Sequence, residues 1–437
     1  MSPPAQIVGV DFGTTNTVVS TLGADGEAQL AGFAAPGGEA TAFRSALSFY
    51  GDDRDPSRRV VEAGPWAIEA YAEEPLETRF IQSFKSYAAS PLFQETRILG
   101  RRYEFEDLLS TYLLRLRAYG GEALPEGASC IVGRPVNFAG ARADADLALR
   151  RYGAAFARLG FAEVRYVFEP VAAAFFFARK LEHGATVLVG DFGGGTSDFS
   201  VVRFERRGGR LRSKALANAG VGLAGDAFDY RIIDNLVSPA LGKGSSYRAF
   251  DHILPLPNRY YAAFARWEQL ALLRASRDMR EIHALVRTAL EPDKISALVK
   301  ILDQNQGYRL YQSVSALKEA LSAHTHARFL FEAGGVRIER EVAREEFEAW
   351  IAPELGAISA AVDEALARAW LAPGDLDRVF LTGGSSFVPA VRRLFADRFG
   401  AERVEGGSEL VSIAAGLAYI GAEPDLDAWS QRALDAA

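Results

Sequence analysis

Apolar residues along this chain fall into short runs typical of buried strands, separated by longer stretches with helical spacing. Two β-rich runs flank a Gly-Thr-Thr turn within residues 6–22, which predicts a hairpin. The run at 130–135 predicts a strand that leads into a loop. The other predicted elements are strands at 186–192, 199–205 and 379–381 and helices at 143–160, 171–180, 344–370, 388–399 and 409–421. Strands that alternate with helices predict an α/β protein.

Three longer stretches have a less regular pattern. Residues 36–60 are rich in turn-forming residues, residues 61–120 mix helical stretches with a predicted lid, and residues 245–330 are expected to be mainly helical. No low-complexity tract or long linker interrupts the chain, so we expect it to be compact throughout.

One motif occurs in both halves of the chain. Residues 7–17 read IVGVDFGTTNT and residues 187–198 read VLVGDFGGGTSD, so each apolar strand ends in Asp-Phe-Gly and a turn of small residues. The first aspartate, Asp11, precedes its counterpart Asp191 by 180 residues. Either turn alone would be explained as a simple hairpin. The repeat instead predicts a duplicated strand–turn unit that binds the phosphates of a nucleotide.

The residue types of the two turns suit phosphate binding. Glycine leaves backbone N–H groups open to an anion, and threonine adds hydroxyl donors. The residues expected to bind nucleotide phosphates here are Gly13, Thr14, Thr15, Asn16, Gly193, Gly194 and Gly195.

Carboxylates and one lysine complete the predicted chemistry. Asp11 and Asp191, at strand ends, are placed to hold Mg²⁺ through its waters, because Mg²⁺ gives up its hydration shell reluctantly. Phosphoryl transfer depends on positioning and charge neutralisation, with one acceptor that orients the attacking water. The candidates for these catalytic roles are Asp198, Glu169, Lys85 and Thr196.

Composition narrows the class of protein. The 437 residues carry a formal net charge of −7, which gives no reason to expect nucleic acid or anionic membrane as a partner. No apolar run approaches the roughly 18 residues of a membrane span, and no secretory signal is visible. Cys130 is the single cysteine, which excludes internal disulfides and cysteine-rich metal sites. We therefore expect a cytoplasmic protein.

Other motifs are weaker. Residues 220–225 match G-x-G-x-x-G, but the preceding KALANA is a poor strand, so we reject a dinucleotide-binding interpretation. The chain has no G-x-x-x-x-G-K-[ST] motif and so is not a P-loop enzyme. His324 and His326 have no third ligand nearby in sequence and are interpreted as surface residues.

The motifs together resemble the nucleotide-binding domain of the 70-kDa heat-shock chaperones, within the actin/hexokinase superfamily. The matching segments run in order along nearly the whole chain: VGVDFGTTNT, GRPVNF, VFEPVAAAFFFA, VLVGDFGGGTSDFSVV, LAGDAFDYRIID and LTGGSSFVPAVRRLF. The resemblance is closest to a short bacterial branch that ends after this domain. We expect this chain likewise to lack the hydrophobic linker and the peptide-binding β-sandwich.

The resemblance implies roles for individual residues. Asp11 and Asp191 would order Mg²⁺ and its waters, and Asp198 would help to place the catalytic water. Glu169 would reach the metal's shell and Thr196 the γ-phosphate. Lys85 stands where the family has its catalytic lysine, and Pro135 would lie at the hinge between the lobes.

The adenosine side departs from the family pattern. In residues 313–322, Lys318 and Ser322 match the adenosine-contacting helix, but Ser315 replaces a glutamate and Glu319 an arginine. Phe387 stands where an arginine usually stacks on adenine, and its ring can stack instead. The full set expected on this side is Gly225, Asp226, Lys318, Ser322, Gly383, Gly384, Ser385 and Phe387. We expect weaker nucleotide affinity than in a full-length chaperone.

The implied architecture is a bilobal actin-like ATPase fold, with duplicated ribonuclease-H-like core subdomains and two smaller lid subdomains. Lobe I is expected at 1–185 and lobe II at 186–404, with the C-terminal helices at 405–437 returning to lobe I. Within the lobes we expect a lid at 39–124, a connecting segment at 125–185, a helical lid at 225–330 and the second adenosine motif at 379–395.

Residues 259–290 are a predicted helical region rich in aromatic and arginine residues: Arg259, Tyr260, Tyr261, Phe264, Arg266, Trp267, Arg274 and Arg280. One interpretation is an extra helical pair that packs its own small core. The other is a surface that docks a protein partner, because exposed aromatic and arginine side chains favour such contacts.

The expected function is slow Mg²⁺-dependent hydrolysis of ATP to ADP, which drives a chaperone-like switch for a partner protein. One alternative is a non-catalytic ATP-binding scaffold or an actin-like assembly protein. Another is a small-molecule kinase of the same superfamily, in which Asp198 would deprotonate a substrate hydroxyl.

Overall fold

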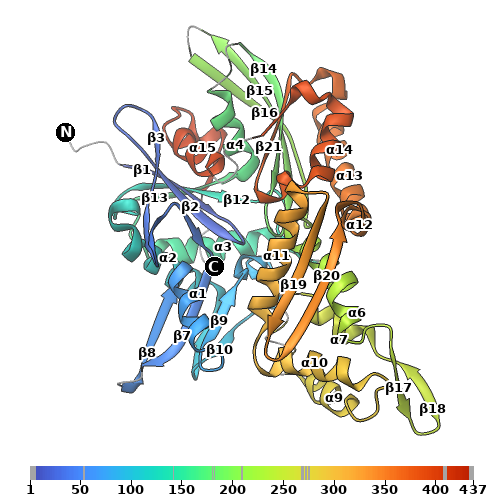
Figure 1. Ribbon diagram of the computed structural model, residues 1–437. Coiled ribbons are helices and arrows are strands. Elements are labelled where there is room, and N and C mark those ends of the chain that lie inside the picture. Colours follow the sequence, from blue (N-terminus) through green and yellow to red (C-terminus); the bar gives the residue numbers. More distant parts are fainter. Residues whose placement is uncertain are drawn as a thin grey trace. The chain divides into compact units, whose positions relative to one another are not determined.

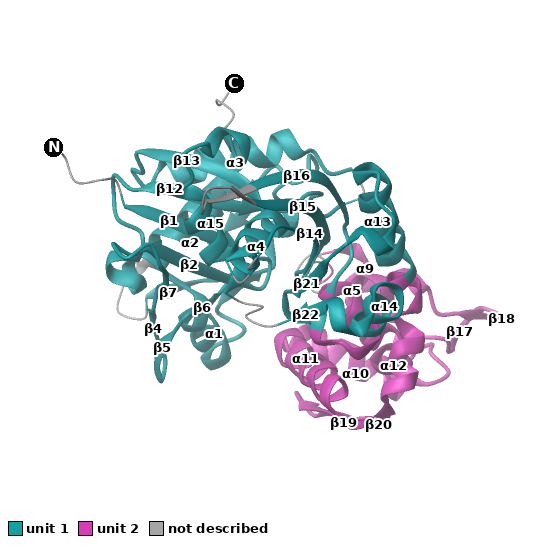
Figure 2. Ribbon diagram, turned by 90° about the horizontal axis from the view of Figure 1, so that it is seen from above, with its two compact units in different colours: residues 1–224, 356–386, 391–437 teal, residues 225–355, 387–390 magenta. Residues whose placement is uncertain are grey.

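The structure is a computed structural model, and it describes residues 6–52, 55–140, 142–179, 181, 183–207, 210–266, 270, 273, 276–406 and 411–432. The described chain forms two compact units (Figure 2). Unit 1 contains residues 1–224, 356–386 and 391–437, and unit 2 contains residues 225–355 and 387–390. Both units mix helices and strands, which confirms the predicted α/β class (Figure 1).

Unit 1 is built on two large sheets, and the five strands from β13 to β3 in the first follow the same order as those from β22 to β16 in the second. Among the described residues, the first has the order β23-β13-β12-β1-β2-β3, with β6 also paired to β2, and the second the order β22-β21-β14-β15-β16. In each sheet the middle strand, β1 or β14, is antiparallel to the next strand in the chain and parallel to a later strand. The strands are β1 (Ile7–Phe12), β2 (Asn16–Leu22), β3 (Ala28–Leu30), β6 (Ala42–Arg44), β12 (Ser129–Arg134), β13 (Glu163–Phe168), β14 (Ala185–Phe192), β15 (Ser197–Arg207), β16 (Arg210–Val221), β21 (Arg378–Thr382), β22 (Val404–Gly406) and β23 (Gln431–Arg432).

Two helices join these sheets through a shared apolar core. Helix α4 (Glu169–Ala178) packs on the second sheet, where the rings of Phe177 and Phe380 stack with centroids 4.2 Å apart. Helix α15 (Ser412–Gly421) lies against β1 and α4. The two helices approach so closely at Gly416 that a Cβ there would overlap the carbonyl of Ala172. This contact fixes the sheets, and so the strand ends that carry the candidate site.

A second core fills the first sheet's other side. It contains Phe12, Phe105, Tyr112 and Tyr152, all buried, with the Phe12 and Tyr152 rings edge-to-face at 6.0 Å. The elements around it are α1 (Gly64–Glu73), α2 (Phe105–Gly120), α3 (Ala145–Ala157), β4 (Phe33–Ala35), β5 (Gly38–Ala40), β7 (Ala46–Asp52), β8 (Asp55–Ala63), β9 (Arg79–Gln82), β10 (Thr96–Ile98) and β11 (Arg101–Tyr103). Helices α13 (Ala352–Ala369) and α14 (Pro389–Phe399) begin in unit 2 and continue into unit 1.

Unit 2 is a smaller body of helices and two hairpins. Its elements are α5 (Gly225–Ile232), a π-helical turn at Ile233–Val237, α6 (Ser238–Ala240), β17 (Ser246–Ala249), β18 (His252–Pro255), α7 (Asn258–Phe264), α9 (Arg277–Leu285), α10 (Pro292–Asp303), α11 (Gly307–Ala323), β19 (His326–Ala333), β20 (Val336–Ala343) and α12 (Arg344–Trp350). Strand β19 alternates exposed and buried residues, as expected for a hairpin covered on one face.

Three sequence expectations were wrong in detail. Most of the described residues of 36–60 lie in paired strands rather than in turns. The stretch at 245–330 is mainly helical in its described residues, as expected, but it also contains the β17–β18 hairpin. KALANA lies in β16, where pairing with β15 outweighs the low strand propensity of its residues. That strand is antiparallel to β15, unlike the parallel first strand of a dinucleotide-binding unit. The helix expected at 344–370 is two helices, with Ile351 between them.

The aromatic residues of 259–290 are mostly internal. Tyr260, Tyr261 and Phe264 are buried, so the described aromatics pack a local core as the first interpretation required. Among its described residues, the region contains helices α7 and α9. Trp267 and Arg274 lie outside the described residues.

Candidate functional site

The two Gly-Thr turns have the same closure. After β1, the Gly13 N–H donates to the Asn16 carbonyl at 2.9 Å, and after β14 the Gly193 N–H donates to the Thr196 carbonyl at 3.0 Å. A Cβ on Gly195 would lie 3.6 Å from the Thr14 hydroxyl oxygen, so the turns face each other within unit 1. An anion between them would meet backbone N–H donors from both sides.

Serine side chains hold each turn from behind. The Ser45 hydroxyl donates to the Gly13 carbonyl at 2.7 Å, and its backbone N–H donates to the Thr15 carbonyl at 2.9 Å. The Ser385 hydroxyl donates to the Gly193 carbonyl at 3.4 Å. Gly383 reaches the second turn too, with a φ of +81° and no room for a Cβ beside the Phe192 carbonyl. These contacts fix the turns without occupying their open side.

Three carboxylates, those of Glu169, Asp191 and Asp198, are buried beside the turns with one lysine, and a fourth, that of Asp11, is partly exposed. The Lys85 Nζ lies 2.7 Å from Glu169 Oε1, with both side chains almost fully enclosed. Asp191 and Asp198 are paired directly across β14 and β15, and Asp11 lies near the end of β1. The structure therefore brings together the sequence-predicted acidic residues and Lys85. Lys85 is an internal ion-pair partner rather than a solvated surface lysine.

Burial dominates the electrostatics of the carboxylates. Removal from water raises the pKa of Asp11 to about 7, with Glu169 adding to the rise and Lys85 opposing it. The same causes raise the pKa of Asp191 well above its ordinary value. Burial would lower the pKa of the Lys85 amine, but nearby Glu169 raises it overall, so the ammonium is retained.

Asp198 is held most precisely. Its Oδ1 accepts from the backbone N–H groups of Val136 at 2.9 Å and Asn137 at 3.2 Å, and the Asn137 amide donates to the Gly220 carbonyl at 2.7 Å. Among the described residues, its buried Oδ2 has no hydrogen-bond partner. Burial and then Glu169 raise the pKa of Asp198 to about 7, while the nearby Thr196 hydroxyl and the Asn137 N–H limit the rise. An oriented carboxyl group with one free oxygen and a pKa near neutrality can accept a proton from water.

The carboxylates beside the two turns suit a hard cation that is bound through its water molecules. Within the described residues, no three His, Cys, Asp or Glu side chains converge closely enough to ligate an ion directly. The carboxylates beside the turns carry more negative charge than Lys85 neutralises, and Asp198 Oδ2 has no partner among the described residues. This excess of negative charge attracts a divalent cation. Mg²⁺ commonly keeps several waters and uses few protein ligands, so these residues fit it.

The residues predicted for the adenosine side are divided between the units. Gly383, Gly384 and Ser385 belong to unit 1, and the other five residues of the set to unit 2. The Lys318 Nζ lies 2.7 Å from Asp229 Oδ1 on α5, and the Ser322 hydroxyl donates to the Lys318 carbonyl at 2.9 Å. Phe387 is about half exposed. Lys318 therefore already neutralises an acidic neighbour.

Sequence reasoning missed several supporting residues. Ser45 lies in a stretch interpreted as turn-rich, and nothing in its neighbourhood pointed to the Gly13 carbonyl. Val136 and Asn137 lie inside the GRPVNF segment, next to Pro135, but they act through backbone N–H groups that every residue except proline carries.

Among the described residues, no helix is long and apolar enough to cross a membrane.

Comparison with known proteins agrees with the geometry. The model of the Hsp70 protein family matches residues 93–245 and 285–422, well over half of the chain. Similar curated proteins include the chaperone protein DnaK of Deinococcus deserti, 27% identical over 440 residues, and that of Deinococcus radiodurans, 26% identical over 440 residues. Each alignment covers 95% of this chain and 59% of the relative. DnaK of Mycoplasmopsis synoviae is 26% identical over 419 residues, which cover 94% of this chain and 58% of the relative. The chain thus spans under two thirds of the length of these relatives, and it belongs to the Hsp70 protein family.

Proposed function

We propose that the chain binds ATP with Mg²⁺ and hydrolyses it slowly, as a nucleotide-driven, chaperone-like switch. The observation that carries the proposal is the pair of facing Gly-Thr turns beside the buried Lys85–Glu169 pair and the oriented Asp198. Membership of the Hsp70 family and similarity to DnaK chaperones support the same conclusion. The matching strand order of the two large sheets supports a bilobal actin-like fold, with lobe I at 1–185 and lobe II at 186–404.

Each residue has a task in this proposal. The backbone N–H groups of the two turns bind phosphate oxygens, and the Thr14, Thr15 and Thr196 hydroxyls add donors. Mg²⁺, when bound, neutralises phosphate charge, and the carboxylates of Asp11 and Asp191 orient its waters. On the adenosine side, the Phe387 ring stacks on the base.

The remaining groups act on the attacking water and the transferred charge. Asp198 orients the water with its free Oδ2 and accepts its proton, while the N–H groups of Val136 and Asn137 hold the carboxylate. The Lys85 ammonium stabilises negative charge that develops on the transferred phosphoryl group, and Glu169 holds Lys85 in place.

The test is single-turnover hydrolysis of labelled ATP with Mg²⁺, with nucleotide binding measured in parallel. We expect slow hydrolysis by the wild type and a loss of about 10²-fold or more in Asp198→Ala, with ATP still bound. Asp425→Ala, which removes an exposed carboxylate, is the control and should hydrolyse at the wild-type rate. Tight binding without turnover in the wild type would favour a non-catalytic scaffold or assembly protein. Phosphate release stimulated by a sugar or polyol would favour a small-molecule kinase, and no binding would refute the proposal.

A further inference from the structure

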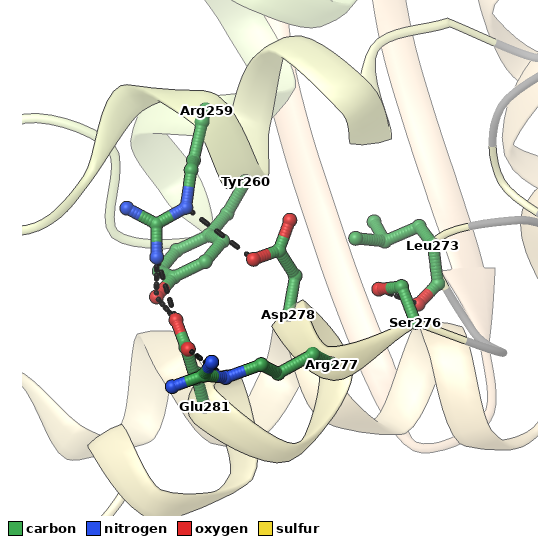
Figure 3. A network of polar contacts seen from close by, with 7 residues as sticks. All are labelled: Arg259, Tyr260, Leu273, Ser276, Arg277, Asp278 and Glu281. Carbon is green, nitrogen blue, oxygen red and sulfur yellow. Dashed lines mark hydrogen bonds and ion pairs between the residues drawn. The ribbon is translucent and has the colours of Figure 1, made fainter.

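Residues 246–284 form a part of unit 2 that the Hsp70 family model leaves unmatched. They contain the β17–β18 hairpin and helices α7 and α9. Figure 3 shows how the two helices are joined: Arg259 Nη2 donates to Glu281 Oε2 at 2.6 Å, the Tyr260 hydroxyl donates to the same oxygen at 2.7 Å, and Arg259 Nε lies 3.3 Å from Asp278 Oδ1. Arg277 also pairs with Glu281, at 3.1 Å. The two described helices of the segment are therefore joined by ion pairs and hydrogen bonds, and the acidic residues of α9, Asp278 and Glu281, already have partners.

The hairpin of this segment exposes apolar side chains. Phe250 is 98% exposed, Ile253 62% and Leu254 42%. In Figure 1 the hairpin extends away from the helices of unit 2, and Figure 2, turned by 90°, shows the same arrangement. Phe250 lies in its tight turn with a φ of +51°, where glycine or asparagine would cost less. A strained and fully exposed phenylalanine contributes nothing to the core, so folding does not explain its presence.

The hairpin also has an open backbone edge. On its inner side, β17 bonds to residues 288–290: the Arg248 N–H donates to the Thr288 carbonyl at 2.8 Å and the Leu290 N–H to the Ser246 carbonyl at 2.9 Å. Arg248 is opposite Ile253, so that pair does not exchange hydrogen bonds within the hairpin. The N–H and C=O of Ile253 therefore point away from β17, and no further strand of the described residues pairs with β18.

Side chains next to this edge combine apolar and cationic character. Ile253 and Arg248 lie on the same face, because directly opposed residues in an antiparallel pair share a face. Leu290, opposite Ser246, adds a half-exposed side chain to that face. Residues 246–284 hold six arginines and four acidic residues, whereas the whole chain has a net charge of −7. The sequence of the unmatched segment is thus weakly basic within an acidic protein, and Arg248 lies on the face of the hairpin that carries Ile253.

We infer that the edge of β18 docks an extended, acidic and apolar segment of a partner protein. The segment adds as a strand, with its backbone bonded to Ile253, which is a common mode of peptide recognition. Alternate apolar side chains contact Ile253, Leu254 and Phe250, and carboxylates lie near Arg248. Charge complementarity favours this occupant over a second copy of the chain, because like-charged molecules of −7 repel each other. The inference does not depend on nucleotide hydrolysis.

Three fluorescein-labelled decapeptides are the probes: alternating Val and Asp, alternating Val and Lys, and the Val-Asp peptide N-methylated at alternate residues so that it cannot pair with an edge strand. We expect the Val-Asp peptide to bind about tenfold more tightly than either other peptide in fluorescence anisotropy. Arg248→Glu should reverse the charge preference, and Ile253→Ser or Phe250→Ser should weaken binding about fivefold or more.

Leu92→Ser is the matched control, because Leu92 is 94% exposed but lies in unit 1. Circular dichroism and thermal unfolding establish that each variant is folded. Equal binding of all three peptides, or an equal loss in Leu92→Ser, would overturn the inference. So would sedimentation velocity that shows a wild-type dimer abolished by Ile253→Lys, since the edge would then bind a second copy.

Discussion

Replacement of Asp198 by asparagine should stabilise the nucleotide-free protein while it removes catalysis. Burial and Glu169 raise the pKa of this carboxyl group to about 7, from an ordinary value of 3.8. A folded-state pKa above the unfolded one means that the native protein holds a proton that the unfolded chain releases. Stability from this group is therefore full below about pH 4 and is lost as pH rises towards 7.

The pKa values set the size of the effect. The difference between 3.8 and about 7 corresponds to about 4 kcal/mol at pH 8, which is an upper limit for the cost of the buried charge. Asparagine carries no charge, and its carbonyl can keep the bonds from the Val136 and Asn137 N–H groups. Because its amide nitrogen replaces an oxygen that has no partner, we expect a net gain of about 1–3 kcal/mol at pH 8 and almost none at pH 4.

Urea unfolding in EDTA at pH 4, 6 and 8 measures this gain. The control is Asp251→Asn, which removes an exposed carboxylate and should leave stability unchanged within about 0.5 kcal/mol at each pH. A gain of the same size at all three pH values would show that asparagine acts through packing rather than charge. An asparagine variant less stable than the wild type at pH 8 would refute the electrostatic argument itself.

Three further predictions follow from the same site and its supports. Lys85→Met should abolish turnover and lower the free energy of unfolding by about 3–5 kcal/mol at pH 8, because Glu169 would keep a buried charge without a partner. Urea unfolding measures this loss. The double variant Lys85→Met/Glu169→Gln should be more stable than Lys85→Met alone. Gly416→Ala should destabilise by about 1–3 kcal/mol or more in thermal unfolding, because its Cβ would force α15 from α4, whereas alanine at the exposed Gly356 of α13, where a Cβ meets nothing within 4 Å, should not. Binding of Mg²⁺ with ADP should release more protons at pH 6.5 than at pH 8.5, because the carboxyl groups of Asp11 and Asp198, whose pKa values are raised, hold protons at the lower pH that the cation displaces. Calorimetry in two buffers of different ionisation enthalpy measures the number of protons released. Equal release at both pH values would contradict this prediction.

The sequence predicted the parts of the site that depend on local chemistry. A strand that ends in Asp-Phe-Gly and a Gly-Thr turn can fold in few ways, so the closures at Gly13 and Gly193 could be expected before the structure. The strands and helices around them were predicted to within a few residues. The residue roles at the site stay predictions, because position alone does not measure binding or turnover.

Features that arise from tertiary pairing could not be predicted in the same way. KALANA has the composition of a helix or a loop, but β15 offers it a ladder of partners. The hairpin at 246–255 has two four-residue strands and contains Pro255, too short a pattern to distinguish from a loop. The Lys85–Glu169 pair joins residues 84 positions apart, and no spacing rule reports such a contact.

The clustering of four carboxylates beside one lysine, three of them buried, gives a physical basis for the proposed control by nucleotide. Without a cation, the negative charge of the cluster is offset by Lys85 and by protons, and at neutral pH the protons offset it only in part because the pKa values of Asp11 and Asp198 lie near 7. A bound cation replaces the protons and contributes stability in proportion to its affinity. The segment at 134–138 bonds directly to Asp198 through Val136 and Asn137 and carries Pro135, which the family resemblance places at a hinge. Loss of the cation would therefore change the charge on the same carboxylate that this segment holds, so occupancy of the site and the position of the segment are expected to be coupled.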